Sequence, residues 1–299
     1  MIKISNISKT FGDVVALENL TIEINSGSVF GLVGSNGSGK STLLRILSGV
    51  YTPDKGKVKI DDADITENED IRGKCAFISD FPYFSNGSTL KEISTLYRAI
   101  YPNWSNERYE ELCGMFPIDE KKRVINMSKG MQRQVALILA LSTQPKYLFL
   151  DEIFDGLDPV VRQLVKKLII SAISENEMTV IIASHNLREL EDFCDHIGFM
   201  HKGGVLLEKD IDDLKLDLHR IQIAFKEELP ENVFDELDVV SYKSSGKVYT
   251  IVVRGNLDDA MSVLNSYDSV YQEVLPLTLE EIFISEMEVA GYDIDNILK

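Results

Sequence analysis

The sequence predicts an α/β fold with a parallel sheet at its core, followed by a small C-terminal α+β domain. Strands alternate with helices between residues 29 and 200, as they do in parallel sheets that helices cover on both faces. A glycine-rich loop joins the first of these strands to a helix. The composition changes after Gly203-Gly204, and strands and helices continue beyond it. We therefore expect one domain over 1–208 and a second over 209–299.

The individual elements follow from hydrophobic periodicity and from breaks at glycine and proline. In the first domain we expect strands at Ile2–Ile4, Leu20–Ile24, Val29–Val33, Lys57–Ile60, Tyr147–Leu150, Thr179–Ala183 and Ile197–Met200. We expect helices from Lys40, at Val160–Ser174, at Leu187–Phe193 and through most of 88–143, which gives a helical subdomain at about 85–145. In the second domain we expect strands at Arg220–Phe225, on both sides of Ser244-Ser245-Gly246 and at Val270–Leu275, with helices at Val233–Leu237, Leu257–Leu264 and Leu279–Val289.

Composition and charge narrow the class of protein. The chain has 299 residues, of which 44% are apolar and 26% charged, which excludes a disordered, collagen-like or coiled-coil protein. No apolar run is long enough to span a bilayer, and we see no signal peptide. The net charge of −17 argues against a nucleic-acid partner, because phosphate backbones attract basic surfaces. Three cysteines without a CxxC pair fit a reducing cytosol rather than a disulfide framework or a zinc site.

The segment Gly34-Ser35-Asn36-Gly37-Ser38-Gly39-Lys40-Ser41 fits the phosphate-binding pattern G-x-x-x-x-G-K-[ST]. Its glycines let the backbone curl so that N–H groups face phosphate oxygens, and the following helix adds its positive end. Lys40 is expected to reach the β and γ phosphates, and the Ser41 hydroxyl is expected to bind Mg²⁺. Thr42 follows in the same nucleotide-binding segment. The pattern indicates a nucleoside triphosphate site of the P-loop type.

A second pair of candidate residues follows the apolar strand Tyr147–Leu150. Asp151 would hold Mg²⁺ through water, and Glu152 would polarise the water that attacks the γ-phosphate. Acidic residues also end strands at protein surfaces without any catalytic role, but the phosphate-binding loop favours the functional interpretation here.

Together these segments resemble the ATP-binding cassette (ABC) ATPases, the nucleotide-binding subunits of ABC transporters. The resemblance covers residues 1 to about 208 and includes the signature-like 127–131 segment, Met-Ser-Lys-Gly-Met. Gly156-Leu157-Asp158-Pro159 and Ser184-His185 match two further family motifs. The resemblance implies a P-loop cassette with N-terminal antiparallel strands beside the parallel sheet. The C-terminal domain resembles the extension of bacterial exporter-type cassettes.

The resemblance also implies roles for particular residues. Phe11 corresponds to the aromatic residue that stacks on adenine, and His185 to the histidine that senses the γ-phosphate. Ser128 and Gly130 are implied to contact ATP bound on a second cassette, because two cassettes of this family pair head to tail. Asp158, in the loop after the glutamate, is also implied to bind nucleotide. Asp80 stands where a metal-binding glutamine is usual, which puts its role in doubt.

Three more positions depart from the family pattern: Lys129 and Met131 in the signature, as in exporter-type cassettes, and Ile153 in place of proline. The aromatic loop at 81–87 either faces the groove for the membrane subunit or packs the helical subdomain, and the sequence leaves both open.

We therefore expect a Mg²⁺-dependent ATPase that couples ATP-driven dimerisation to export through a separate transmembrane permease subunit. We expect the chain to lie in the cytoplasm, where that partner holds it at the inner face of the cell membrane. The second cassette is either another copy or a different chain. Two alternatives are a soluble ABC ATPase without a transporter and a weakly catalytic ATP-binding half of a heterodimer.

Overall fold

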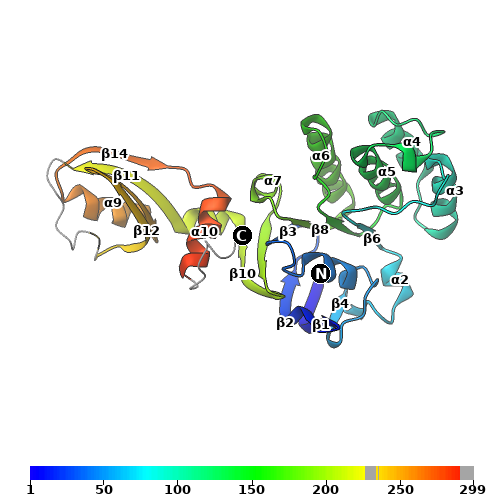
Figure 1. Ribbon diagram of the computed structural model, residues 1–299, viewed down its shortest axis with the longest axis horizontal. Helices are drawn as coiled ribbons and strands as arrows, with labels where there is room; N and C mark the ends of the chain where they lie inside the picture. The colour runs from blue at the N-terminus through cyan, green and yellow to red at the C-terminus, as the bar shows by residue number, and fades with distance from the viewer. Residues whose placement is uncertain (226–233, 235, 290–299) are drawn as a thin grey trace. The chain divides into compact units, whose positions relative to one another are not determined.

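The computed structural model describes residues 1–225, 234 and 236–289 of the chain. Its contacts divide the protein into two compact units, Met1–Glu208 and Lys209–Lys299, each with its own hydrophobic core. Figure 1 shows the elements of both units in chain order. Among the described residues, no helix combines the length and the apolar character needed to cross a membrane.

The first unit contains a six-stranded sheet in the order β10-β9-β3-β8-β7-β6. Its strands are β3 (Val29–Val33), β6 (Cys75–Ile78), β7 (Tyr147–Asp151), β8 (Thr179–Ser184), β9 (His196–His201) and β10 (Gly204–Asp210). The pairs β9–β3, β3–β8, β8–β7 and β7–β6 are all parallel, which confirms the predicted α/β fold. Every residue of β3, β7 and β8 is buried, because such a sheet is covered on both faces.

A second, antiparallel sheet lies on one side of the first. It has the order β2-β1-β4-β5 and contains β1 (Ile2–Phe11), β2 (Val14–Ile24), β4 (Lys55–Ile60) and β5 (Ala63–Asp64). Helix α1 (Lys40–Leu47) packs between the two sheets: its leucines share one core with the isoleucines of β1 and with Phe30 and Phe149 of the parallel sheet.

Helices on the other side of the parallel sheet include a helical subdomain (Figure 1). Its elements are α3 (Leu90–Ile100), α4 (Asn106–Met115), the 3-10 turn η1 (Val124–Asn126) and α5 (Lys129–Ser142). Helix α5 packs against β6 and α4, so this subdomain lies next to the sheet edge at β6. The remaining helices of the unit are α2 (Glu69–Arg72), α6 (Pro159–Asn176) and α7 (Leu187–Glu191).

The second unit is an antiparallel sheet with helices. The sheet has the order β12-β13-β11-β14, with β11 (Leu218–Phe225), β12 (Asp238–Ser245), β13 (Val248–Arg254) and β14 (Ser269–Leu275). Its helices are α8 (Ile211–Asp217), α9 (Leu257–Asn265) and α10 (Leu279–Val289). Ala260 and Leu264 of α9 pack on apolar residues of β11 and β13. The helix expected at Val233–Leu237 falls largely outside the described residues.

Candidate functional site

Four neighbouring strands end at the same edge of the parallel sheet. Because β3, β8, β7 and β6 run in one direction, their carboxyl ends bring together segments that are far apart in the chain. The phosphate loop follows β3, Asp151 ends β7, His185 follows β8, and Asp80 lies just beyond β6. Ligands of open α/β sheets bind at this edge, so most of the predicted site residues converge on one place.

The phosphate loop has the backbone that its glycines were expected to allow. Gly37 and Gly39 have φ angles of 81° and 107°, in the left-handed region that favours glycine. A side chain at Gly34 would come within 2.3 Å of the Met200 carbonyl oxygen, so only glycine fits there. Ser35 and Asn36 are exposed, whereas Ser38 is buried and its Oγ has no hydrogen-bond partner within the described structure.

Lys40 is folded back into this loop. Its Nζ donates hydrogen bonds to the carbonyl oxygens of Gly34, at 2.6 Å, and Ser35, at 3.2 Å, and lies 3.8 Å from Oε1 of Glu152. Burial lowers the pKa of Lys40, and the negative charges of Glu152 and Asp151 partly oppose that effect. Lys40 therefore already lies between the loop and the second candidate pair of residues.

Asp151 and Ser41 form a pair that suits a magnesium ion. Ser41 Oγ donates to Oδ1 of Asp151 at 3.0 Å, and Asp151 is fully buried. Its Oδ2 is also buried and has no hydrogen-bond partner among the described residues. Burial raises the pKa of Asp151, and the Asp80 carboxylate adds to this effect. An unsatisfied carboxylate oxygen beside a hydroxyl is a donor set that Mg²⁺ accepts, so these residues fit the ion.

Glu152 and His185 are in direct contact. Oε2 of Glu152 lies 2.9 Å from Nδ1 of His185 and also accepts the His185 backbone N–H at 3.4 Å. Glu152 has a φ of 48°, unusual for a residue with a side chain, and its N–H donates to the Ala183 carbonyl oxygen. The strained turn thus holds Glu152 at the ends of β7 and β8. Two residues predicted from separate motifs are therefore in hydrogen-bond contact.

Arg133, in the Gln132-Arg133-Gln134 run that follows the signature-like 127–131 segment, was not among the predicted site residues. Arg133 of α5 is buried, its Nη2 donates to the carbonyl oxygen of Asp80 at 3.0 Å, and its Nη1 donates to that of Asp155. The Asp80 side chain accepts the N–H of Phe81 at 2.9 Å. Because the hydrogen-bond acceptors of Arg133 among the described residues are backbone oxygens, no spacing of paired side chains marks it in the sequence.

Ser128 and Asp158 cap helices in this structure. Ser128 Oγ accepts the Met131 N–H at the start of α5, and Oδ1 of Asp158 accepts the N–H groups of Val160 and Val161 at the start of α6. Within the described residues, no hydrogen bond or ion pair joins either side chain to the phosphate loop.

Gly130 and Phe11 complete the predicted set. A side chain on Gly130 would lie 2.8 Å from the Gly156 carbonyl oxygen, so α5 packs directly on the loop that follows β7. Phe11, at the end of β1, is 42% exposed and meets Tyr51 edge-on, with 5.3 Å between ring centroids. An exposed aromatic ring of this kind is free to stack on a nucleobase. Thr42 lies in the first turn of α1 and is half-buried.

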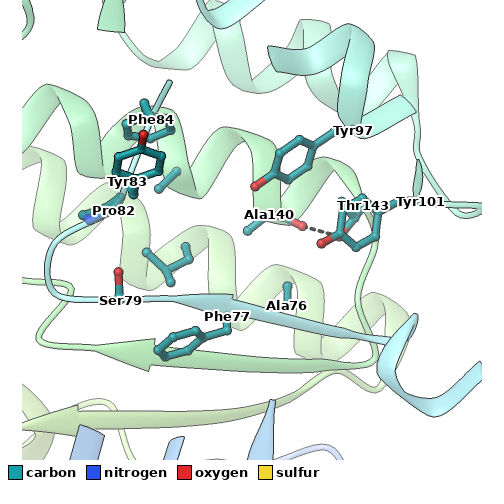
Figure 2. A pocket seen from close by; sticks show the side chains of 12 residues that line it. Ala76, Phe77, Ser79, Pro82, Tyr83, Phe84, Tyr97, Tyr101, Ala140 and Thr143 are labelled. Carbon is teal, nitrogen blue, oxygen red and sulfur yellow. Dashed lines mark hydrogen bonds between the residues drawn. The ribbon is translucent and has the colours of Figure 1, made fainter. Parts of the chain in front are cut away.

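A pocket of about 130 Å³ opens between β6, α3 and α5 (Figure 2). Figure 2 shows aromatic side chains around it, among them Tyr83, Phe84 and Tyr97. Tyr83 is 87% exposed and the neighbouring Phe81 is 68% exposed. Part of the 81–87 loop therefore lines the helical subdomain, while the rings of Phe81 and Tyr83 remain accessible.

Comparisons with known proteins point to one family. Residues 17–155 match the family described as ABC transporter. The chain is 29% identical over 286 residues to the ABC transporter ATP-binding protein YtrB of Bacillus subtilis, covering 96% of this chain and 98% of that protein. It is 34% identical over 219 residues to the lantibiotic transport ATP-binding protein SrtF of Streptococcus pyogenes, covering 71% and 92% respectively. The chain also superposes on MJ0796, an ATP-binding cassette solved as a dimer in a post-hydrolysis state with ADP and phosphate. The TM-score is 0.63 and the sequence identity 25%, over 71% of this chain and 99% of MJ0796.

Proposed function

Because this chain belongs to the ABC transporter family of ATP-binding proteins, we propose that it is the Mg²⁺-dependent ATPase subunit of a transporter that exports its substrate through a separate membrane subunit. The observation that carries the proposal is the contact between Glu152 and His185, beside Lys40 and the Ser41–Asp151 pair. A general base, a phosphate-binding cation and a metal-binding pair lie together at one sheet edge, as hydrolysis of a nucleoside triphosphate requires.

The chemistry divides among these side chains. Lys40 exchanges its bonds to the Gly34 and Ser35 carbonyls for the β and γ phosphates of ATP. Ser41 and Asp151 would hold Mg²⁺, which would supply positive charge against the phosphate oxygens. Glu152 accepts the proton of the attacking water, and His185 holds that carboxylate in place and senses the γ-phosphate.

A second cassette completes the site in this proposal. Ser128 and Gly130 at the start of α5 supply a hydroxyl and N–H groups to the γ-phosphate bound on the other cassette, and Asp158 lies in the same contact. The MJ0796 cassette, which this chain resembles, is a dimer in its solved structure. The Phe11 ring stacks on adenine, and Asp80 acts at the metal in place of glutamine.

The decisive experiment compares the wild-type protein with Glu152→Gln. We expect the wild type to hydrolyse Mg²⁺-ATP, and the variant to bind ATP without hydrolysing it and to form a dimer with ATP but not with ADP. Size-exclusion chromatography with light scattering measures the dimer, and phosphate release measures turnover. Glu177→Gln, an exposed carboxyl-to-amide change at the end of α6, is the matched control and should behave as wild type. Wild-type turnover in Glu152→Gln would refute the role of Glu152, and a monomer in ATP would indicate that a different cassette is needed.

Coupling to a membrane subunit is the second half of the proposal. The accessible rings of Phe81 and Tyr83 beside the aromatic pocket form the surface that we assign to it. Such a subunit would hold the protein at the inner face of the membrane. A photo-crosslinking residue at position 83 should label a membrane-spanning protein in native membranes. The same residue at Ile170, which is also exposed on α6, should not. Equal labelling at both positions would refute this surface.

Export rather than import is supported by Lys129 and Met131 of the signature and by the C-terminal domain, which resemble those of exporter-type cassettes. The test is transport in inverted membrane vesicles that contain this chain and its crosslinked partner. ATP-dependent uptake of the substrate into inverted vesicles supports export, and uptake into right-side-out vesicles would overturn it.

A further inference from the structure

Arg133 joins three segments around the candidate site. It lies in the second turn of α5 and is 7% exposed. One guanidinium nitrogen donates to the carbonyl oxygen of Asp80 at 3.0 Å, and another donates to that of Asp155. The two acceptors are 53 and 22 residues away from Arg133 in the chain. A single buried side chain thus connects the helical subdomain to two separate loops.

Both loops carry residues of the site. Asp80 follows β6, and Asp155 lies three residues after Glu152, in the loop between β7 and α6. A guanidinium is a planar group with donors in a fixed arrangement, so bonding with two of them sets the separation of the two carbonyl groups. The position of the Glu152 turn relative to the Asp80 loop therefore depends on Arg133.

The start of α5 is attached to the same loops at two further points. The Nζ of Lys129 lies over the Phe81 ring, 5.5 Å from its centroid. Gly130 lies so close to the Gly156 carbonyl oxygen that even a methyl group there would come within 2.8 Å of it. A displacement of either loop without α5 would remove one of the two acceptors of the buried Arg133 guanidinium, and an unpaired buried donor is costly. The three segments are thus built to move together.

From this geometry we propose that Arg133 is a positioning residue for ATP hydrolysis. It keeps the loops of Asp80 and Glu152 in register with each other and with the start of α5. This inference rests on the proposed function for its catalytic part. Its structural part, that Arg133 fixes both loops, holds or fails by itself.

The test compares Arg133→Gln and Arg133→Lys with Arg98→Gln, which removes an exposed arginine of α3. We expect Arg133→Gln to lower kcat by about tenfold or more, while its Kd for a fluorescent ATP analogue changes less than about threefold. Lysine has one ammonium group instead of a fork, so Arg133→Lys should recover part of kcat. Arg98→Gln should match the wild type. Hydrogen exchange of nucleotide-free protein should become faster in both 79–82 and 153–158 in Arg133→Gln.

The outcomes separate positioning from plain stability. An Arg133→Gln protein with wild-type kcat, or with unchanged exchange in these two segments, would overturn the proposal. The proposal would also be overturned if Arg133→Gln lost kcat and ATP affinity in parallel and Arg133→Lys restored neither, because that result indicates a folding defect. If Arg133→Gln fails to fold, Arg133→Lys decides: a reduced kcat at unchanged Kd supports positioning, and a wild-type kcat refutes it. If the wild type itself hydrolyses no ATP, the proposed function fails, and the exchange of the two segments still decides whether Arg133 fixes them.

Discussion

Asp151 places a carboxylate in the protein interior, and one of its oxygens lacks a hydrogen-bond donor within the described structure. Burial raises the pKa of this group, so the native state binds its proton more tightly than the unfolded chain does. The ionised form therefore lowers the stability of the nucleotide-free protein as pH rises from the unfolded pKa through the native one. A magnesium ion binds the ionised carboxylate. The charge that metal binding requires at Asp151 therefore lowers the stability of the nucleotide-free protein.

We therefore predict that Asp151→Asn stabilises the nucleotide-free protein near neutral pH. Asparagine keeps an acceptor for Ser41 Oγ and removes the buried charge. The gain should be about 1–2 kcal/mol, or roughly 2–8 °C in Tm for a unit of this size. Differential scanning fluorimetry across pH measures it, and the difference should disappear at acid pH, where Asp151 is protonated in the wild type. Mg²⁺-ATP should stabilise the wild type more than the variant. A variant that is less stable than the wild type at neutral pH would contradict this account.

Phe11 allows a second prediction for a single residue. Loss of an aromatic stacking surface costs about 1–3 kcal/mol per base, so Phe11→Ala should weaken ATP binding by about tenfold. Phe11→Trp keeps a stacking surface and should bind ATP nearly as well as the wild type. Titration with a fluorescent ATP analogue measures both. Equal affinity in all three proteins would show that adenine binds elsewhere.

At the level of single residues, the motifs identified much of the candidate site in advance. The phosphate loop, Asp151-Glu152 and His185 each have a sequence pattern, and the parallel sheet places them together. Arg133 has no such pattern, because its partners are backbone carbonyl oxygens of distant loops. Contacts of this kind depend on tertiary packing and leave no spacing rule in the chain.

Among the elements, α6 raises a question about Asp158. Its carboxylate caps this helix through the N–H groups of Val160 and Val161, and it is also predicted to contact a second cassette. Asn and Asp are equally good caps, whereas alanine costs about 1 kcal/mol. We predict that Asp158→Ala lowers Tm by roughly 2–4 °C and that Asp158→Asn leaves Tm unchanged.

Dimerisation then separates the two roles of Asp158. In the Glu152→Gln background, which should retain ATP, Asp158→Asn keeps the cap and alters the charge. Weaker ATP-dependent dimerisation in light scattering would support a contact between cassettes. Unchanged dimerisation with unchanged Tm would leave Asp158 a helix cap alone and refute its predicted binding role.

The accuracy of the predicted strands and helices depends on how regular the burial pattern of each element is. The strand predicted at Val29–Val33 matches β3, because a fully buried strand is a continuous apolar run. The strand predicted at Ile2–Ile4 extends as β1 to Phe11, since register shifts interrupt its alternation. Strand β10 and helix α8 were not predicted. The residues of β10 are only half-buried over most of its length, so its pattern is weak.

For the whole molecule, the division into two units gives the last prediction. The first unit contains every candidate site residue and has a core that joins both of its sheets, whereas the second unit, which is strongly acidic, has a separate core around α9. ATP stabilises only a unit that binds it, by about 2.7 kcal/mol at a hundredfold excess over Kd.

Calorimetry of Glu152→Gln with Mg²⁺-ATP should therefore resolve two transitions and move only one, upward by roughly 5–10 °C. ADP without the γ-phosphate should move it less, because the contacts of Lys40 and a second cassette are incomplete. A single transition that shifts as a whole would mean that the two units unfold together. In that case the second unit would gain the same ATP-dependent stability as the first, and destabilising changes in its core would lower the Tm of the whole chain.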